Sequence, residues 1–310
     1  MSRQPLVSIA VLALCVAVVS PAPLAGQESD YAPPRTPWGD PDLRGHYLPG
    51  TSQPLETPRL EPWGDTQYTG HNYTFTRFFR PEGDGPARPR ERVRTPMIID
   101  PPDGRVPLQE WAAEKRDEIM ERQEELAFLD PRVKCLPAAL PRAHLPVGYN
   151  TYQILQVPGA VIILYEWNHH SRYIPLDGRP HLPSAIRLGM GDSRGRWEGD
   201  TLVVEATNFT DNTWPVGHGA PPEGAPASSI NSGHGVFHSG ALRVVERFIP
   251  VDENTINYQA TIEDPNVFTQ PWTLRYEGLK RAPADHILYE YACHEGNGRN
   301  LRLMTGADFQ

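Results

Sequence analysis

The chain has 310 residues, 39% of them hydrophobic, and a formal net charge of −9. This acidic charge argues against nucleic acid and anionic membrane surfaces as partners, because both attract basic proteins. The 26 glycines and 34 prolines are many for a globular chain and favour turns and ordered loops over long helices.

The first 26 residues have the pattern of a secretory signal. Arg3 is the only charged residue before Glu28, and small residues follow the apolar run Val7–Val19. A basic start, an apolar centre and a small-residue end predict export with cleavage, and the run is too short to span a bilayer. Gln27 stands where a lipoprotein would have Cys. We therefore expect a periplasmic or extracellular product without a membrane anchor.

Two cysteines remain once Cys15 leaves with the signal. Cys135 and Cys293 form an even pair in an oxidising compartment, which predicts a disulfide. A reactive or metal-binding thiol is the alternative. Cys293 precedes His294 without the second cysteine of a c-type haem motif, so no haem is expected.

Residues 27–106 are expected to form a Pro-rich arm that wraps a main domain at residues 107–310. The tetrapeptide PWGD occurs at Pro37–Asp40 and at Pro62–Asp65, which is too little to establish a repeat. The arm carries many aromatic residues, namely Trp38, Trp63, Tyr68, Tyr73, Phe75, Phe78 and Phe79. Linkers rarely hold so many, so docking on the main domain is expected.

One helix is predicted over Leu108–Phe128. Pro107 precedes it, Asp130-Pro131 terminates it, and its apolar residues form a partial stripe. We expect this helix to pack outside a sheet and to carry no chemistry.

From about residue 150 the apolar pattern changes to period two. Thr255–Glu263 alternates without exception, and the segments that start at Leu242, Trp272 and Ile287 alternate similarly. Further strands are expected at 151–157, 159–167, 171–175 and 200–208. About eight strands with short links predict a mainly β fold, either an antiparallel up-and-down barrel of the lipocalin or calycin type or a sandwich. Many inward positions are aromatic, which favours the barrel.

The connection Trp214–Gly235 is too long for a turn. Loops of this length in compact domains are usually functional or disordered. It contains His218 and His234, and His238 follows it. We interpret this loop as a candidate lid.

Glu246 is the candidate catalytic or ligand-binding residue that the sequence pattern places most specifically. It alternates with apolar residues of its strand, which places its carboxylate on the inward face. A carboxylate there must be paired or protonated. Paired with Arg187 or Arg275 it would be structural, whereas alone in a cavity it would be a general acid–base group or a ligand anchor.

Glu166, His169 and His181 are the other candidate catalytic residues, because they follow a buried strand closely. A histidine near a glutamate can supply a base with an orienting partner, although such groups can also cap strand ends. No HExxH or CxxC motif is present, so neither a cofactor nor a metal site is predicted. A divalent metal bound by histidines is the alternative.

Several further residues are candidate ligand contacts. Arg172 and Arg179 could bind a carboxylate or a sugar acid, or they could form ion pairs in the turn at Asp177-Gly178. The segment from Asp192 to Asp200 is interpreted as a similar ion-paired turn. The remaining candidates are Trp214 at the start of the candidate lid, His238 just after the lid, and four residues at inward strand positions, Tyr258, Trp272, Tyr276 and Tyr289.

Several motifs occur together over most of the chain, among them PRTPWGDPDLRG, IPLDGRPHLPS, MGDSRGRWEGDTLVVEATNFTD and YEYACHEGN. In this combination the chain resembles a large family of uncharacterised secreted bacterial proteins. The resemblance implies export and a bacterial source. It implies no activity, substrate or catalytic residue.

Together these observations predict an exported β-barrel protein that binds a small aromatic or glycan-like molecule in an internal cavity. A periplasmic hydrolase or lyase with Glu and His acid–base groups is the alternative. A structural envelope protein is the second alternative.

Overall fold

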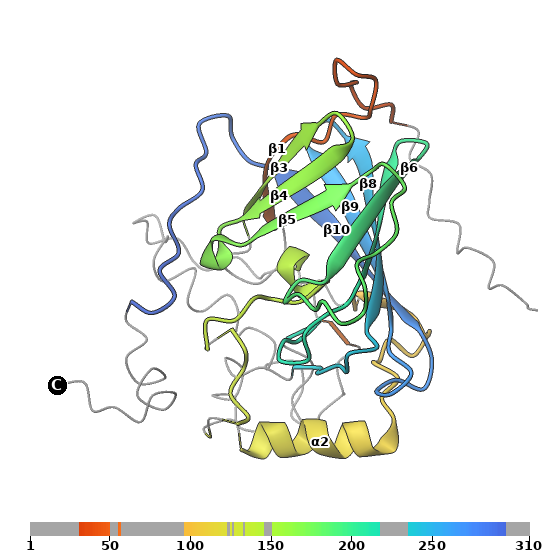
Figure 1. The fold of residues 1–310 in the computed structure, drawn as a ribbon, viewed down its shortest axis with the longest axis vertical. Coiled ribbons are helices and arrows are strands. Elements are labelled where there is room, and N and C mark those ends of the chain that lie inside the picture. Colours follow the sequence, from red (N-terminus) through yellow and green to blue (C-terminus); the bar gives the residue numbers. More distant parts are fainter. Residues whose placement is uncertain are drawn as a thin grey trace, which may run out of the picture.

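The computed structural model describes residues 31–49, 55–56, 96–122, 125, 127–132, 134–145, 151–217 and 235–295. Within this part of the chain, ten strands form one antiparallel sheet that curls into a nearly closed barrel (Figure 1). The predicted mainly β, barrel-like fold is therefore confirmed.

Nine strands follow one another around the barrel in the order β5-β4-β3-β1-β10-β9-β8-β7-β6. In chain order they are β1 (Gly45–Pro49), β3 (Tyr152–Val157), β4 (Ala160–Tyr165), β5 (Ser171–Pro175), β6 (Asp192–Glu198), β7 (Thr201–Thr207), β8 (Arg243–Asp252), β9 (Thr255–Glu263) and β10 (Trp272–Arg281). The tenth strand, β2 (Ile98–Asp100), pairs with the start of β10. Apart from the insertion of β1, the connections are those of an antiparallel meander.

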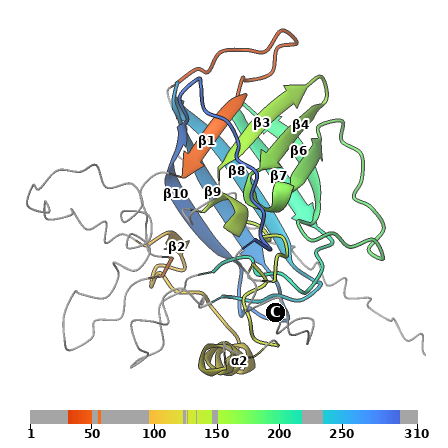
Figure 2. The ribbon, with the colours of Figure 1, turned by 90° about the vertical axis from the view of Figure 1, so that its left-hand side faces the viewer.

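The N-terminal arm takes part in the barrel itself. β1 lies between β3 and β10 (Figure 2), and its Tyr47 pairs with Tyr152 on one side and Arg281 on the other. Without β1, the facing edges of β3 and β10 would expose unpaired backbone groups. Strands β1 and β2 of the arm are short and have little alternation. The sequence therefore predicted that the arm wraps the main domain, but not that it pairs into the sheet.

The alternation predicted for β8, β9 and β10 is confirmed. Every second side chain on these strands points inward and is buried, as for Val244, Glu246, Phe248, Ile256, Tyr258, Ala260, Ile262, Trp272, Leu274 and Tyr276. The segment interpreted as an ion-paired turn is instead β6. Its charged residues occupy alternate positions and face outward, while Ser193 and Gly195 are buried on the inner face.

The predicted strand at 287–293 does not form. Residues 283–295 pair with no strand in the described part of the chain, and the side chain of Tyr289 is 65% exposed. Since β10 already pairs with β9 on one side and with β1 and β2 on the other, it has no free edge for another strand. The expectation that Tyr289 faces the interior is therefore wrong.

The helix α2 (Glu110–Glu121) is shorter than predicted and lies below one end of the barrel (Figure 1). Figure 2 views it nearly end-on. It begins late because Leu108 forms a bridge with Phe268 and the Gln109 N–H donates to the Val267 carbonyl, which holds both residues extended. In the described residues no helix is long and apolar enough to cross a bilayer.

Two segments cover the ends of the barrel. At the end uppermost in Figure 1, Gln156 of β3 accepts a hydrogen bond from the Leu43 N–H and donates to the Pro41 carbonyl. This holds residues 31–44 across the upper mouth. At the lower end the short helix η1 (Arg142–His144) is fully buried.

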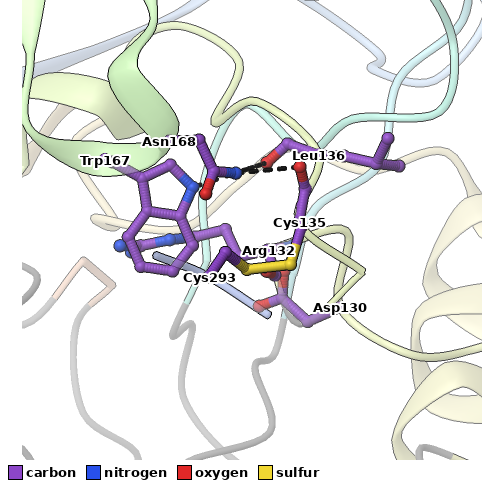
Figure 3. Close-up of a disulfide and its surroundings, with 7 residues drawn as sticks. All are labelled: Asp130, Arg132, Cys135, Leu136, Trp167, Asn168 and Cys293. Carbon is purple, nitrogen blue, oxygen red and sulfur yellow. Dashed lines mark hydrogen bonds between the residues drawn. A yellow bond between two sulfur atoms is a disulfide. The ribbon is translucent and has the colours of Figure 1, made fainter. Parts of the chain in front are cut away.

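The disulfide between Cys135 and Cys293 forms as predicted, with the Cα atoms 5.7 Å apart (Figure 3). Two residues of η2 (Trp167–His169) cover it. Asn168 Nδ2 donates to the Cys135 carbonyl at 2.8 Å, and the Arg132 guanidinium stacks on the Trp167 ring at 3.6 Å. The bond ties the C-terminal segment to the residues that lead into η1, and it is compatible with an exported protein.

Replacing both cysteines, as Cys135→Ser with Cys293→Ser, should lower the free energy of unfolding by about 5 kcal/mol in the chain-entropy model. The reason is the sequence separation of 158 residues, which the bond closes into a loop. Urea denaturation with and without a thiol reductant measures the effect. Reductant should destabilise the wild type and leave the double variant unchanged. A loss below about 1 kcal/mol would contradict a stabilising role, because a loop of this length predicts several times more.

Candidate functional site

Glu246 lies inside the barrel and is fully buried, as its strand alternation predicted. Its Oε1 accepts a hydrogen bond from the Tyr258 hydroxyl at 2.7 Å, and its Oε2 accepts one from Arg172 Nη2. Of the two expected outcomes, the structure has the ion pair, but the partner is neither Arg187 nor Arg275. It is Arg172 on β5, which the sequence suggested as a ligand contact.

His144 enters this cluster from η1 at the lower end. Its Nε2 lies 3.0 Å from the Tyr165 hydroxyl and 3.5 Å from Glu246 Oε1. Four strands contribute aromatic rings whose centroids lie 4.9 to 5.5 Å from the His144 ring, namely Tyr152, Tyr165, Phe248 and Tyr258. His144 is not among the residues predicted from the sequence, since its segment PRAHLP has no periodic pattern that would place it on a face.

Burial determines the ionisation states in this cluster. Desolvation, with a smaller contribution from Arg172, lowers the pKa of His144 well below its usual 6.5, so the imidazole is neutral at pH 7. For Arg172, desolvation opposes the charge, but the Glu246 carboxylate outweighs it and raises the pKa of the guanidinium. Burial also raises the pKa of Tyr165 and Tyr258, so both hydroxyls keep their protons.

Arg172 also closes the seam of the barrel. β5 and β6 are the two ends of the strand order, and no hydrogen-bonded ladder joins them among the described residues. Arg172 Nε donates to Ser193 Oγ of β6 at 2.7 Å. A Cβ atom on Gly195 of β6 would lie 2.6 Å from Leu176 and 2.8 Å from Ile174, so both side chains pack directly on the glycine backbone.

The cluster leaves no water-sized space beside it. Glu246, His144, Tyr152 and Tyr258 have no exposed surface. The Tyr152 hydroxyl and His144 Nδ1 are buried without a hydrogen-bond partner among the described residues, and each such group costs about 1–3 kcal/mol. The sequence predicted a ligand cavity beside Glu246, but the described side chains fill this region.

The other predicted aromatic contacts do not converge on Glu246. Trp272 is fully buried and packs on Phe268 with ring centroids 5.6 Å apart, and Tyr276 is core as well. Trp214 packs against Gly235. In His238, Nε2 lies 3.0 Å from Thr213 Oγ1 and Nδ1 lies 2.7 Å from the Ser239 carbonyl. The rest of the candidate lid, with His218 and His234, lies outside the described residues.

Glu166 and His169 are neighbours in sequence but form no acid–base pair. Desolvation raises the pKa of the Glu166 carboxyl, and hydrogen bonds from the Thr151 hydroxyl and the Tyr289 N–H partly offset this. His169 is exposed and has a φ of 52°, which turns the chain at the end of η2. The two residues meet only through the backbone, where the His169 N–H donates to the Glu166 carbonyl at 3.4 Å.

His181 lies on the outer surface of the barrel. Its Nδ1 is 2.8 Å from Asp192 Oδ2, and its Nε2 is 3.4 Å from Glu205 Oε1. Burial opposes ionisation of Asp192, but hydrogen bonds from the Leu182 N–H, His181 and Arg194 outweigh it and lower the pKa. His181 thus has an orienting carboxylate, but the barrel wall separates it from Glu246.

The remaining predicted contact, Arg179, forms an ion pair with Asp177 in an exposed turn, as the alternative interpretation expected. Among the described residues, no group of three or more His, Cys, Asp or Glu side chains is placed to hold a metal ion.

A cleft of about 590 Å³ opens at the upper mouth, at the opposite end from His144. One wall comes from residues 31–45, with Tyr31, Pro33 and Pro34. The other wall comes from the β8–β9 hairpin, with Pro250 and Glu253. No local sequence pattern points to this cleft, because nothing within the hairpin shows that the arm folds back beside it.

Arg281 holds the two walls together. Its Nε donates to the Glu253 carbonyl at 3.1 Å, its Nη2 to the Tyr47 hydroxyl at 3.1 Å, and its Nη1 to the Arg44 carbonyl. The guanidinium lies against Gly45, where any Cβ would clash and where a φ of 148° also favours glycine. The geometry of the cleft is therefore fixed before any ligand arrives.

No protein-family model matches the chain, and no curated protein or solved structure gave a significant match. The family resemblance stays a prediction.

Glu246→Gln should lower the free energy of unfolding by about 3–5 kcal/mol, because Arg172 is left buried without its counter-charge. Arg172→Met with Glu246→Leu should recover most of that loss. Asp177→Asn breaks an exposed pair and serves as the control, with an expected change below about 1 kcal/mol. Chemical denaturation measures all three. A double variant no more stable than Glu246→Gln would contradict the interpretation as an ion pair.

Acid should destabilise the fold through His144. Because its folded pKa lies below the usual 6.5, the unfolded chain binds more protons between these two values. The free energy of unfolding should therefore fall as the pH drops below 6.5, by up to about 1.4 kcal/mol per pH unit from this residue. His170 and His238 act in the same direction.

The measurement is the slope of stability against pH, compared between wild type and His144→Gln. The slope should be shallower in the variant. Equal slopes would mean that His144 binds a proton in the folded state as readily as in the unfolded chain, which would contradict the prediction.

Proposed function

We propose that this protein is exported and binds a small polar organic molecule in the cleft at the upper mouth of its barrel. The predicted signal and the Cys135–Cys293 disulfide support export. The preformed cleft of about 590 Å³ carries the binding proposal. Its size lies within the range of about 300–1,000 Å³ that is usual for ligand pockets, which often occupy the mouths of barrels.

The chemistry of the cleft suits a glycan-like molecule. Pro33, Pro34 and Pro250 supply apolar surfaces that can cover the C–H face of a ring. Asp42 and Glu253 supply hydrogen-bond acceptors at the edges. A ligand that is apolar on one face and hydroxylated at its rim would satisfy both sets of groups.

Binding of a ligand inside the barrel would cost more free energy than binding in the cleft. A guest beside Glu246 would have to displace packed tyrosines and separate a fully buried ion pair from Arg172. Leaving either charge unpaired costs about 3–5 kcal/mol before any contact with the guest forms. The cleft needs no such rearrangement.

Acid–base catalysis by a hydrolase or lyase mechanism is the second candidate, and one observation favours it. Asp192 holds His181 Nδ1 at 2.8 Å, the arrangement of a base with an orienting partner. In a substrate screen, turnover lost in His181→Gln while thermal stability is retained would support catalysis.

Filling the cleft tests the binding proposal directly. Pro34→Trp should weaken any ligand at least about tenfold by occupying its space, a change of about 1.4 kcal/mol. Pro183→Trp is the matched control, since both prolines are exposed and use their carbonyls as acceptors of one backbone N–H, from Asp42 and Ile186.

Ligand-observed NMR with a library of neutral sugars, sugar acids, amines and aromatic compounds provides the measurement. Ligands bound equally by both proline variants would place the site elsewhere. A library without any ligand would refute binding.

A further inference from the structure

The charged groups of the cleft are mostly acceptors. The described lining has three carboxylates, Asp42, Asp252 and Glu253, and two guanidinium groups, Arg44 and Arg281. The Arg44 hydrogen bond is the main cause that lowers the pKa of Asp42, and the Asn254 N–H is the main cause for Asp252, so both carboxyls are ionised at pH 7.

Both guanidinium groups are already committed to the protein. Arg44 forks onto Asp42, with Nε to Oδ1 at 2.9 Å and Nη2 to Oδ2 at 2.6 Å. Arg281 uses all three nitrogens on oxygens of Glu253, Arg44 and Tyr47. An anionic ligand would have to compete with these contacts, and it would face the carboxylates of the hairpin.

The hairpin carboxylates retain accepting capacity. Glu253 Oε1 accepts a hydrogen bond from Asn254 Nδ2 at 3.0 Å, and Asp252 Oδ1 accepts one from the Asn254 N–H at 2.8 Å. Asp252 also accepts hydrogen bonds from the Thr255 N–H and hydroxyl. An ionised carboxylate offers about four acceptor positions, so the exposed Glu253 keeps most of its positions open to a ligand and Asp252 keeps about one.

The backbone of the walls adds to this imbalance between acceptors and donors. Three of the lining residues, Pro33, Pro34 and Pro250, have no N–H to donate. The cleft is therefore rich in acceptors and poor in donors.

We infer that the ligand is a hydroxylated primary amine, of which an amino sugar is the simplest case. This inference rests on the proposed function and specifies the ligand class. The ammonium and hydroxyl groups supply the donors that the cleft lacks, and the ammonium balances the lining charge. The net charge of −9 attracts such a cation at longer range.

Four probes on the same ring scaffold separate charge from shape: D-glucosamine, N-acetyl-D-glucosamine, D-glucose and D-glucuronate. Calorimetric titration of the mature chain at low salt should show D-glucosamine bound at least about fivefold more tightly than the two neutral sugars, with D-glucuronate weakest. Raising the salt to about 0.5 M should narrow these differences, because the charges in the cleft are exposed and become screened.

Glu253→Gln removes one hairpin charge while keeping the shape of the side chain. It should reduce the preference for D-glucosamine over D-glucose by about threefold, the size expected for one exposed charge pair. Glu118→Gln is the matched control, because Glu118 is also an exposed glutamate but lies on α2 at the other end of the molecule.

The outcomes separate this inference from the proposed function. Equal affinity for D-glucosamine and its neutral relatives, or tighter binding of D-glucuronate, overturns the inference and leaves binding in the cleft intact. Binding of D-glucosamine that Pro34→Trp leaves unchanged also overturns it. If neither the probes nor the wider library yields a ligand that Pro34→Trp weakens, both proposals fail.

Discussion

The ion pair between Arg172 and Glu246 is the interaction on which the rest of the structure depends. β5 and β6 have no ladder between them in the described residues, so the barrel is held at this seam by side chains. Arg172 reaches Ser193 on β6 and Glu246 on β8, and so fastens three strands from the inside. A buried pair of this kind contributes little net stability compared with apolar packing, but breaking it leaves an expensive charge. Its main effect is to specify which strands meet.

The same pair explains why the lower end of the barrel is closed. His144 fits beside Glu246 as a neutral ring and fills the space between four aromatic side chains. The segment that carries His144 is also held from outside, since Cys135 lies nine residues before His144 and is bonded to Cys293. The disulfide and the buried histidine therefore act on one segment, from its two sides.

Because the described side chains fill the interior around Glu246, we place the proposed binding site at the upper mouth. The cleft there exists because the arm pairs into the sheet through β1 and then lies across the barrel beside the β8–β9 hairpin. Arg281 fixes this geometry by bonding to both walls at once. The arm thus completes the sheet and also forms half of the binding site that we propose.

The sequence by itself determined the local features: the β class, the alternation of β8 to β10, the inward position of Glu246 and the cysteine pair. These follow from period, side-chain polarity and cysteine number, all readable within short windows. Only the tertiary structure decided that Arg172 is the partner of Glu246, that His144 fills the interior, and that Arg44 and Glu253 share a cleft. Each of these contacts joins residues that are far apart in the chain, and no local pattern encodes which distant partner a side chain meets. The segment 287–293 illustrates the same limit of local patterns. Its residues alternate as in a strand, but no sheet edge was left for it to pair with.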